Sequence, residues 1–128
     1  MSILGIGCDV EEVDRFNLDK DADKTFLNRI FTPLEQAYCF SFSSPAPHLA
    51  GRFCAKEAVI KAFSQASMKI PEYHHIEILN GPSGVPFVSD SGIFEDMGKT
   101  INIHISISHC ASYAMAVATV SSRDEAKK

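Results

Sequence analysis

The sequence predicts a single α+β domain, in which β-strands near both ends of the chain flank one long helix. Three observations support this fold class. Residues 101–108 alternate apolar and polar side chains without a fault, as a half-buried strand does. The segments 3–10 and 113–120 are short apolar runs typical of buried strands. Residues 48–66 form the strongest helical stretch, and 128 residues is the length of one domain.

Composition excludes several classes of protein. Hydrophobic residues make up 45% and charged residues 22%, which excludes collagen-like, low-complexity and disordered chains. The formal net charge of −4 argues against general binding to nucleic acids or anionic membranes, although an acidic protein can carry a local basic pocket. The four cysteines are scattered, and no apolar run reaches the roughly 20 residues of a membrane span. Because the first residues also lack the basic region of a signal peptide, we expect a cytoplasmic protein with free thiols.

The first predicted strand, residues 3–10, contains glycines that mark the close approach of another backbone or of a ligand. Alternation along this strand places Gly7, Asp9 and Glu11 on one face. Two carboxylates would therefore lie beside a gap that no side chain fills.

Residues 11–30 have apolar positions three and four apart, which favours an amphipathic helix with a break near 17–21. The tetrapeptide Thr-Pro-Leu-Glu at 32–35 is typical of a capping box with proline at the first helical position. The helix that it begins is expected to extend to about Phe40 and to end before the Ser/Pro-rich loop at 41–47. The glutamate of the capping box needs no catalytic role.

The helix at 48–66 has apolar residues on more than one face, so we expect it to be packed on several sides. It also carries four charged residues, Arg52, Lys56, Glu57 and Lys61. A buried charge is tolerated only when it is paired or bound to a ligand, so these four residues require partners.

The remainder of the chain alternates short strands with turns. Its expected parts are a strand at 76–79, a tight turn at 80–87, a short helical or irregular piece at about 91–99, the alternating strand at 101–108, a turn at 109–112, the apolar strand at 113–120 and a solvated tail at 121–128. The domain is therefore expected to span 1–120.

Charged residues on the first strand and the long helix indicate chemistry with phosphates. Asp9 and Glu57 could supply the carboxylate oxygens that Mg²⁺ prefers. Arg52, Lys56 and Lys61 would then offer positive charge to the phosphates of a ligand. The spacing alone is explained more simply by an i,i+4 ion pair between Glu57 and Lys61 on the helix surface.

Two other features have simple structural explanations. His109 ends the alternating strand, where a lone histidine is more often a structural hydrogen-bonding group than a catalyst. The glycines and prolines at 80–87 match no phosphate-loop pattern and indicate an ordinary turn.

Five segments, taken together and in order, closely resemble the small 4′-phosphopantetheinyl transferases of the holo-acyl-carrier-protein synthase type. They are GIGCDVEEVDRF, IFTPLE, LAGRFCAKEAVIKAF, SGVPF and ISISHCASYAMAVA. The resemblance covers residues 3–120, and the pairing of Gly-x-Asp with Arg-Phe-x-x-Lys-Glu-Ala-x-x-Lys is highly specific. It implies a small, mainly antiparallel sheet packed around a long central helix.

The resemblance implies that 4′-phosphopantetheine is transferred from coenzyme A to a serine of an apo acyl carrier protein in fatty acid synthesis, with release of adenosine 3′,5′-bisphosphate. It implies that Asp9 and Glu57 hold Mg²⁺ against the coenzyme A pyrophosphate, with Lys61 beside it, and that these three residues are catalytic. Arg52 and Lys56 would contribute charge to the nucleotide phosphates. The resemblance also assigns coenzyme A-binding positions to Gly84, Pro86, Ser108 and His109.

The resemblance also implies partners. Small members of the family form homotrimers in which the Ser-Ile-Ser-His strand of one subunit meets the Gly-x-Asp strand of its neighbour, so that active sites lie between subunits. Their acidic carrier protein is received by basic residues of the first helix, and Arg15 is the best candidate contact. No nucleic-acid or membrane partner is expected.

Three points stay open at the level of the sequence. Glu11 lies where larger members of the family have a further metal ligand, and whether it contacts Mg²⁺ directly or through water is open. The base that deprotonates the serine could be Glu57 or a metal-bound water. The alternatives to the fatty acid role are a transferase for polyketide or peptide synthetase carriers, and a non-catalytic module that binds coenzyme A or a carrier protein.

Overall fold

The structure is a computed structural model that describes residues 2–89 and 100–123. Its elements, in order, are the strands, α-helices and 3₁₀ helices (η) β1 (Ile3–Glu12), η1 (Val13–Phe16), α1 (Lys24–Ile30), α2 (Pro33–Phe40), α3 (Ala46–Gln65), η2 (Tyr73–His75), β2 (Ile78–Asn80), β3 (Pro86–Val88), β4 (Ile101–His109) and β5 (Tyr113–Ser122). The predicted piece at 91–99 and residues 124–128 of the predicted tail lie outside the described residues.

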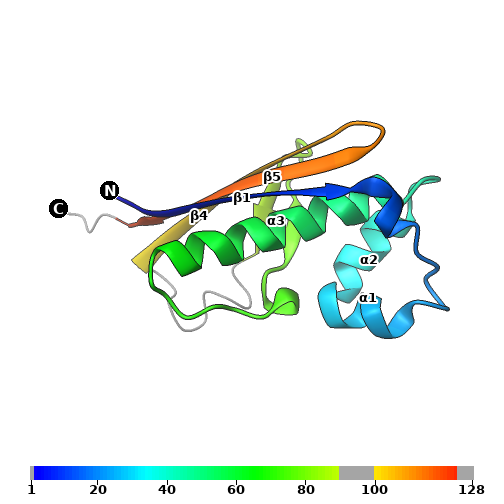
Figure 1. The fold of residues 1–128 in the computed structure, drawn as a ribbon, viewed down its shortest axis with the longest axis horizontal. Helices are drawn as coiled ribbons and strands as arrows, with labels where there is room; N and C mark the ends of the chain where they lie inside the picture. The colour runs from blue at the N-terminus through cyan, green and yellow to red at the C-terminus, as the bar shows by residue number, and fades with distance from the viewer. Residues whose placement is uncertain (1, 90–99, 124–128) are drawn as a thin grey trace.

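The strands form a three-stranded antiparallel sheet of order β1-β5-β4 and a separate antiparallel pair, β2-β3. Helix α3 runs along one face of the larger sheet, and α1 and α2 gather at the N-terminal end of α3 (Figure 1). The register places Asp9 of β1 opposite Ala116 of β5, which in turn lies opposite Ile107 of β4. The predicted α+β domain, with an antiparallel sheet around a long central helix, is confirmed.

The glycines of β1 allow α3 to lie directly against the strand. A Cβ atom on Gly5 would be 2.1 Å from the carbonyl oxygen of Ala62, and one on Gly7 would be 2.1 Å from that of Ala58. No side chain fits at such distances, so only glycine permits this approach of helix backbone to strand backbone. Of the two partners predicted for these glycines, a backbone or a ligand, the structure shows the backbone.

Helix α3 is buried on several sides, as its apolar residues predicted. Its buried residues include Leu49, Ala55, Val59 and Phe63, none of which is exposed to solvent. The opposite face of the larger sheet is different, because exposed apolar side chains lie along it. They are Leu4, Ile6, Val10, Tyr113 and Met115. Among the described residues, no helix is long and apolar enough to cross a membrane.

The segment predicted as one broken helix at 11–30 is shorter and more irregular than expected. Strand β1 continues to Glu12, a 3₁₀ turn follows, and the α-helix begins only at Lys24. The intervening loop is held by the carboxylate of Asp19, which accepts hydrogen bonds from the backbone N–H groups of Asp21 and Ala22 at 2.9 and 2.7 Å. Such local side-chain bonds compete with helical backbone bonds, which explains why the helix starts late.

Most other boundaries agree within a few residues, but the turn predicted at 80–87 is shorter than expected, because Pro86–Val88 form strand β3 and pair with β2. The capping box of α2 is present: the N–H of Glu35 donates to Thr32 Oγ1 at 3.3 Å, and the N–H of Thr32 donates to Glu35 Oε1 at 2.9 Å. Helix α3 begins at Ala46, two residues before its predicted start. Strand β5 continues to Ser122, so the first two residues of the predicted tail belong to the sheet, and the N–H of Ser122 bonds to the carbonyl of Ser2 at 2.8 Å.

Candidate active site

The contact between β1 and α3 brings together the catalytic residues that the resemblance implied. Lys61 Nζ lies 3.2 Å from Asp9 Oδ1 and 3.0 Å from the carbonyl oxygen of Cys8. The hydrogen bond to Asp9 raises the pKa of Lys61 above its ordinary value. Lys61 therefore reaches across to the strand, and the i,i+4 pair with Glu57 that spacing alone favoured is not the arrangement observed.

Three carboxylates share this region. The pKa of Glu11 is raised to about 7, chiefly by burial, then by hydrogen bonding to Asp9 and by the negative charges of Asp9 and Glu57, with Arg15 acting in the opposite direction. Asp9 Oδ2 is buried and has no hydrogen-bond partner. The strand alternation predicted for Gly7, Asp9 and Glu11 is confirmed, because all three are turned toward α3.

Glu57 is held by a residue that the sequence reasoning did not single out. The hydroxyl of Tyr73 donates a hydrogen bond to Glu57 Oε2 at 2.5 Å. This bond, together with burial, raises the pKa of Tyr73 to about 12. Tyr73 lies in η2, within a stretch whose polar composition indicated only a connection, so no sequence signal pointed to it.

The carboxylates fit a divalent cation that is shared with a substrate. In residues 2–89 and 100–123, no three of histidine, cysteine, aspartate and glutamate are arranged as a complete metal site. Mg²⁺ does not need one, because it commonly binds through one or two carboxylates, several waters and a substrate phosphate. The buried, unpartnered Oδ2 of Asp9 is a ligand atom of the required type, and a cation beside it would offset the repulsion among the three carboxylates.

Lys56 does not lie with the other candidates. Its side chain is fully buried, and its Nζ atom contacts Glu35 Oε1 at 2.9 Å and the carbonyl oxygens of Tyr73 and Ile76 at 2.9 and 2.7 Å. In this position it cannot offer charge to a phosphate at the surface. The expectation from the sequence that Lys56 binds a phosphate is therefore not met. Glu35 is correspondingly more than a helix cap, because it is the buried counter-charge of Lys56.

Four of the predicted coenzyme A-binding residues do meet in one pocket of about 200 Å³. It lies where α2 and α3 approach the β2-β3 turn and the end of β4. The residues that line it are Tyr38, Pro47, His48, Gly51, Arg52, Asn80, Gly84, Pro86, Ile107 and His109. Among the described residues that line it, arginine and histidine are the only ionisable groups apart from tyrosine, so the pocket is suited to an anion.

Arg52 is the centre of this pocket. Its guanidinium lies 4.1 Å from the centroid of the Tyr38 ring and hydrogen-bonds Asn80 Oδ1, while its Nε atom is buried without a partner. Asn80 Nδ2 in turn donates to the carbonyl of Gly84 at 2.8 Å. Gly84 has a φ of +88°, a backbone conformation that favours glycine. The turn glycine is therefore part of the pocket wall and is linked to the arginine through Asn80.

His48 is a second residue that the sequence reasoning missed. Its ring stacks on Phe42 with centroids 3.6 Å apart and lies 5.7 Å from the ring of His109. Burial, followed by the positive charges of His109 and Arg52, lowers the pKa of His48. Its position on the first turn of α3, in line with Arg52 one turn later, was the only available signal.

Ser108 and Arg15 lie away from these two centres. Ser108 pairs with Met115 and is exposed, on the opposite face of the sheet from Ile107, because neighbouring strand residues alternate. Arg15 is an exposed residue that contacts Glu11 Oε1 at 3.4 Å. It borders an apolar hollow of about 300 Å³ lined also by Glu11, Phe16, Leu18, Phe26 and Phe53.

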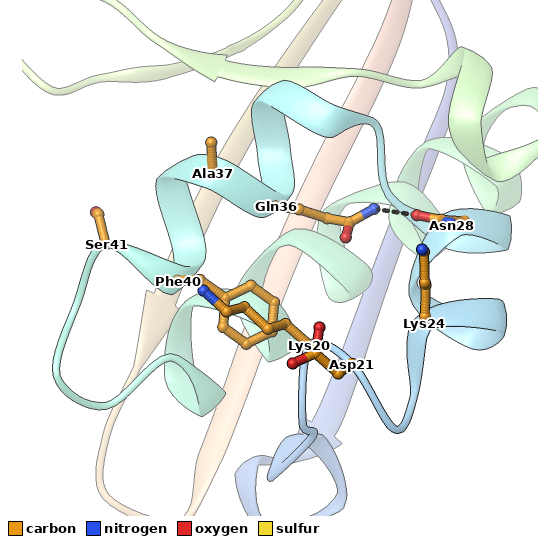
Figure 2. Close-up of a pocket in the computed structure, with 8 residues that line it drawn as sticks. All are labelled: Lys20, Asp21, Lys24, Asn28, Gln36, Ala37, Phe40 and Ser41. Atoms are coloured by element: carbon orange, nitrogen blue, oxygen red, sulfur yellow. Dashed lines mark hydrogen bonds between the residues drawn. The ribbon is translucent and has the colours of Figure 1, made fainter.

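A larger pocket of about 360 Å³ contains none of the predicted site residues (Figure 2). It lies between the loop before α1, helix α1 and helix α2, and is lined by Lys20, Asp21, Lys24, Asn28, Gln36, Ala37, Phe40 and Ser41. Across it, the amide of Gln36 donates to Asn28 Oδ1 at 2.9 Å. Pocket size alone therefore does not locate the chemistry of this protein.

The fold and the sequence comparisons together define a class of transferase. A sequence model of the 4′-phosphopantetheinyl transferase superfamily matches residues 5–118, and the chain belongs to that superfamily. Within it, the chain is similar to holo-[acyl-carrier-protein] synthases. That of Protochlamydia amoebophila is 45% identical over 93% of this chain and 98% of its own length, and that of a Geobacillus strain is 38% identical over 89% and 92%.

Solved structures agree with this assignment. The holo-(acyl-carrier-protein) synthase of Bacillus anthracis in complex with CoA (3′,5′-ADP) is 30% identical, with a TM-score of 0.74 over 96% of this chain and 100% of that one. The Helicobacter pylori synthase in complex with coenzyme A is 29% identical, with a TM-score of 0.71 over 91% and 99%. The family and the fold that the sequence predicted are therefore confirmed.

Proposed function

We propose that the protein transfers 4′-phosphopantetheine from coenzyme A to a serine of an apo acyl carrier protein, with Mg²⁺ as cofactor, and releases adenosine 3′,5′-bisphosphate. The observation that carries this proposal is the contact between Lys61 and Asp9 across the glycine-lined junction of β1 and α3. It joins a cation to a carboxylate whose Oδ2 atom has no hydrogen-bond partner, at the point where the Gly-x-Asp and Lys-Glu-Ala-x-x-Lys motifs of the resemblance meet.

Asp9 and Glu57 would hold the Mg²⁺, which supplies charge neutralisation of the pyrophosphate. Lys61 binds the pyrophosphate beside them and stabilises the charge on the leaving bisphosphate. Such transfers depend mainly on positioning and charge, and the enzyme forms no covalent intermediate. The proton of the attacking serine passes either to Glu57 or to a water molecule.

The pocket around Arg52 receives the nucleotide part of coenzyme A. Arg52 and His109 contact its phosphate groups, while Gly84 and Pro86 form the wall. Ser108 lies on the other face of β4, so its contact with coenzyme A would have to arise at a subunit interface.

Arg15 and the apolar hollow beside it receive the carrier protein. An exposed arginine next to an apolar depression suits a partner that is acidic at its rim and apolar at its centre. The hollow includes Glu11, which also borders Asp9, so a carrier seated there would bring its serine toward the carboxylates.

We further infer a homotrimer, acting in the cytoplasm in fatty acid synthesis. The exposed apolar face of β1 and β5 supports an interface between subunits, because contiguous apolar surface on a small domain commonly marks one. The four cysteines are free, which is consistent with a reducing compartment.

The decisive experiment incubates the protein with Mg²⁺, coenzyme A and purified apo carrier proteins. Mass spectrometry of a fatty acid carrier should show the added phosphopantetheine group, and a chelator should abolish the gain. Faster modification of a polyketide or peptide synthetase carrier would reassign the substrate. Binding of coenzyme A without transfer to any carrier would instead define a binding module and contradict the proposal.

A further inference from the structure

The carboxylate of Glu57 has a dedicated hydrogen-bond donor. Tyr73 Oη lies 2.5 Å from Glu57 Oε2, a distance typical of a strong, charge-assisted hydrogen bond. Both side chains are only partly exposed, which limits competition from water. The donor comes from η2, in the connection between α3 and β2, and so from outside the helix that carries the acceptor.

Tyr73 is itself held at both ends. Its carbonyl oxygen accepts a hydrogen bond of 2.9 Å from Lys56 Nζ, and its ring stacks on Phe53 with centroids 5.6 Å apart and planes 26° apart. Lys56 is fixed in turn by its ion pair with Glu35. Phe53 and Glu57 lie one turn apart on α3, and Lys56 is the neighbour of Glu57, so one helix holds the tyrosine and the carboxylate and the hydroxyl is placed before any ligand arrives.

The neighbouring carboxylates explain why Glu57 requires a fixed hydrogen-bond donor. The negative charge of Glu11 lies close enough to those of Glu57 and Asp9 to interact with both, and like charges drive a flexible glutamate side chain away. A fixed hydroxyl on one oxygen opposes that movement and leaves the second oxygen for another partner. Carboxylates that bind metals are commonly oriented by a hydrogen bond of this kind.

We propose that Tyr73 is a positioning residue for the metal site: its hydroxyl fixes Glu57 Oε2 so that the other oxygen of Glu57 is presented to the cation together with Asp9. The inference rests on the proposed function, because it takes Asp9 and Glu57 as the residues that hold Mg²⁺. It adds to that function a tyrosine that neither touches the reacting atoms nor binds the metal.

Tyr73→Phe is the test variant, because it removes the hydroxyl and keeps the ring on Phe53 and the carbonyl on Lys56. Mn²⁺ binding, followed by electron paramagnetic resonance with coenzyme A present, should weaken roughly 10- to 100-fold. The apparent KM for Mg²⁺ should rise by a similar factor, while kcat at saturating Mg²⁺ falls less. Thermal unfolding without metal should stay close to wild type. Thr25→Ala, which removes an exposed hydroxyl of α1 outside the proposed sites, is the control and should bind Mn²⁺ as wild type does.

Further outcomes separate this inference from the proposed function. Unchanged Mn²⁺ affinity in Tyr73→Phe, or loss of its fold, would overturn the positioning role. In a Glu57→Gln background, Tyr73→Phe should add little, because its target carboxylate is gone, whereas fully additive losses would count against the inference. If Glu57→Gln itself binds Mn²⁺ normally, Glu57 is not a ligand, and the proposed metal site fails together with the role of Tyr73.

Discussion

Arg52 and Lys56 lie one turn apart on α3, yet their charges are used differently. Arg52 Nε has no partner, although the guanidinium contacts Tyr38 and Asn80, so the group has capacity left for a ligand. The three hydrogen-bond donors of the Lys56 ammonium group are all occupied, because its Nζ atom contacts one carboxylate oxygen and two carbonyl oxygens. Of the two, only Arg52 is available for binding, and Lys56 is a structural residue of the core.

Lys56→Met should therefore destabilise the fold by roughly 3–5 kcal/mol, because it leaves the fully buried carboxylate of Glu35 without its counter-charge. Chemical denaturation measures this loss. Adding Glu35→Gln to Lys56→Met should recover part of it, since the amide keeps an oxygen for the N–H of Ile78 without a charge. Lys20→Met, at an exposed lysine, is the control and should change stability by less than about 0.5 kcal/mol. If Lys56→Met and Lys20→Met lowered the free energy of unfolding equally, the role of the buried pair of Lys56 and Glu35 would be contradicted.

His48 is expected to couple phosphate binding to proton uptake. Its pKa is lowered by burial and by the positive charges of His109 on β4 and Arg52 on its own helix, and Tyr38 of α2 is a further titratable neighbour. A bound phosphate adds negative charge, which favours the protonated imidazole. Coenzyme A should therefore bind more tightly as the pH falls toward the lowered pKa of His48.

The sign for stability is the opposite. Because the pKa of folded His48 is lowered, the unfolded chain takes up the proton first, and the contribution of neutral His48 is complete above about pH 6.5 and is lost as the pH falls through the folded value. His48→Gln should reduce both effects. Calorimetry of coenzyme A binding in buffers of different ionisation enthalpy measures the protons taken up, and an unchanged proton count in the variant would contradict the coupling.

At the scale of single residues, two sequence motifs, Gly-x-Asp and Lys-Glu-Ala-x-x-Lys, were enough to select Asp9, Glu57 and Lys61 as site candidates. The structure places these three residues in one region. The sequence could not predict Tyr73 or His48. Their importance depends on which side chains three-dimensional packing brings to them, and neither residue belongs to a motif. The same limit explains Lys56, whose partner Glu35 lies on another helix and already had a satisfactory explanation as a cap.

At the scale of elements, the junction of β1 and α3 determines the geometry of the site. Gly7→Ala should destabilise the protein by at least about 1–3 kcal/mol, because its Cβ would lie 2.1 Å from the carbonyl oxygen of Ala58 and must push the helix away. The same displacement should separate Lys61 from Asp9 and reduce transfer activity. Thermal unfolding and the carrier assay measure the two effects.

Gly81→Ala is the matched control. Its Cβ would meet nothing closer than the carbonyl oxygen of Val85 at 3.7 Å, an ordinary contact. Stability close to wild type is therefore expected. A Gly7→Ala protein that unfolds and reacts like the Gly81→Ala protein would show that the strand and the helix can move apart without consequence.

Elements with a strong period were predictable, whereas those shaped by local side-chain bonds were not. Residues 101–108 alternate, and the strand there ends within one residue of its predicted end. The expected helix at 11–30 failed because apolar spacing does not report the bonds that Asp19 makes to its own loop. The two-residue extension of β5 depends on pairing with Ile101 and Asn102 of β4 and with the start of the chain, which no local pattern encodes.

At the scale of the whole molecule, the sheet has one covered and one uncovered face. Helix α3 covers the first. On the second, Leu4 and Ile6 of β1 are 41% and 51% exposed, and Val10 and Met115, which face each other across β1 and β5, are 63% and 48% exposed. A small domain gains little from such a surface unless another molecule covers it, and the trimer that the resemblance implies would do so.

Val10→Lys tests this assembly. The side chain is largely exposed in the single chain, so the variant should fold, whereas a charge in the centre of an apolar interface opposes association. Light scattering should show a fall from trimer to monomer. Because the proposed active sites lie between subunits, transfer activity should be lost in parallel although Asp9 and Lys61 are intact. Raising the protein concentration should restore part of the trimer and part of the activity.

Leu34→Lys, at an α2 residue that is 61% exposed, is the control. It places the same charge on a different surface and should leave the mass of the assembly and the transfer activity unchanged. A monomeric Val10→Lys protein with full activity would show that one chain holds a complete site, and an undisturbed trimer would place the interface on another face.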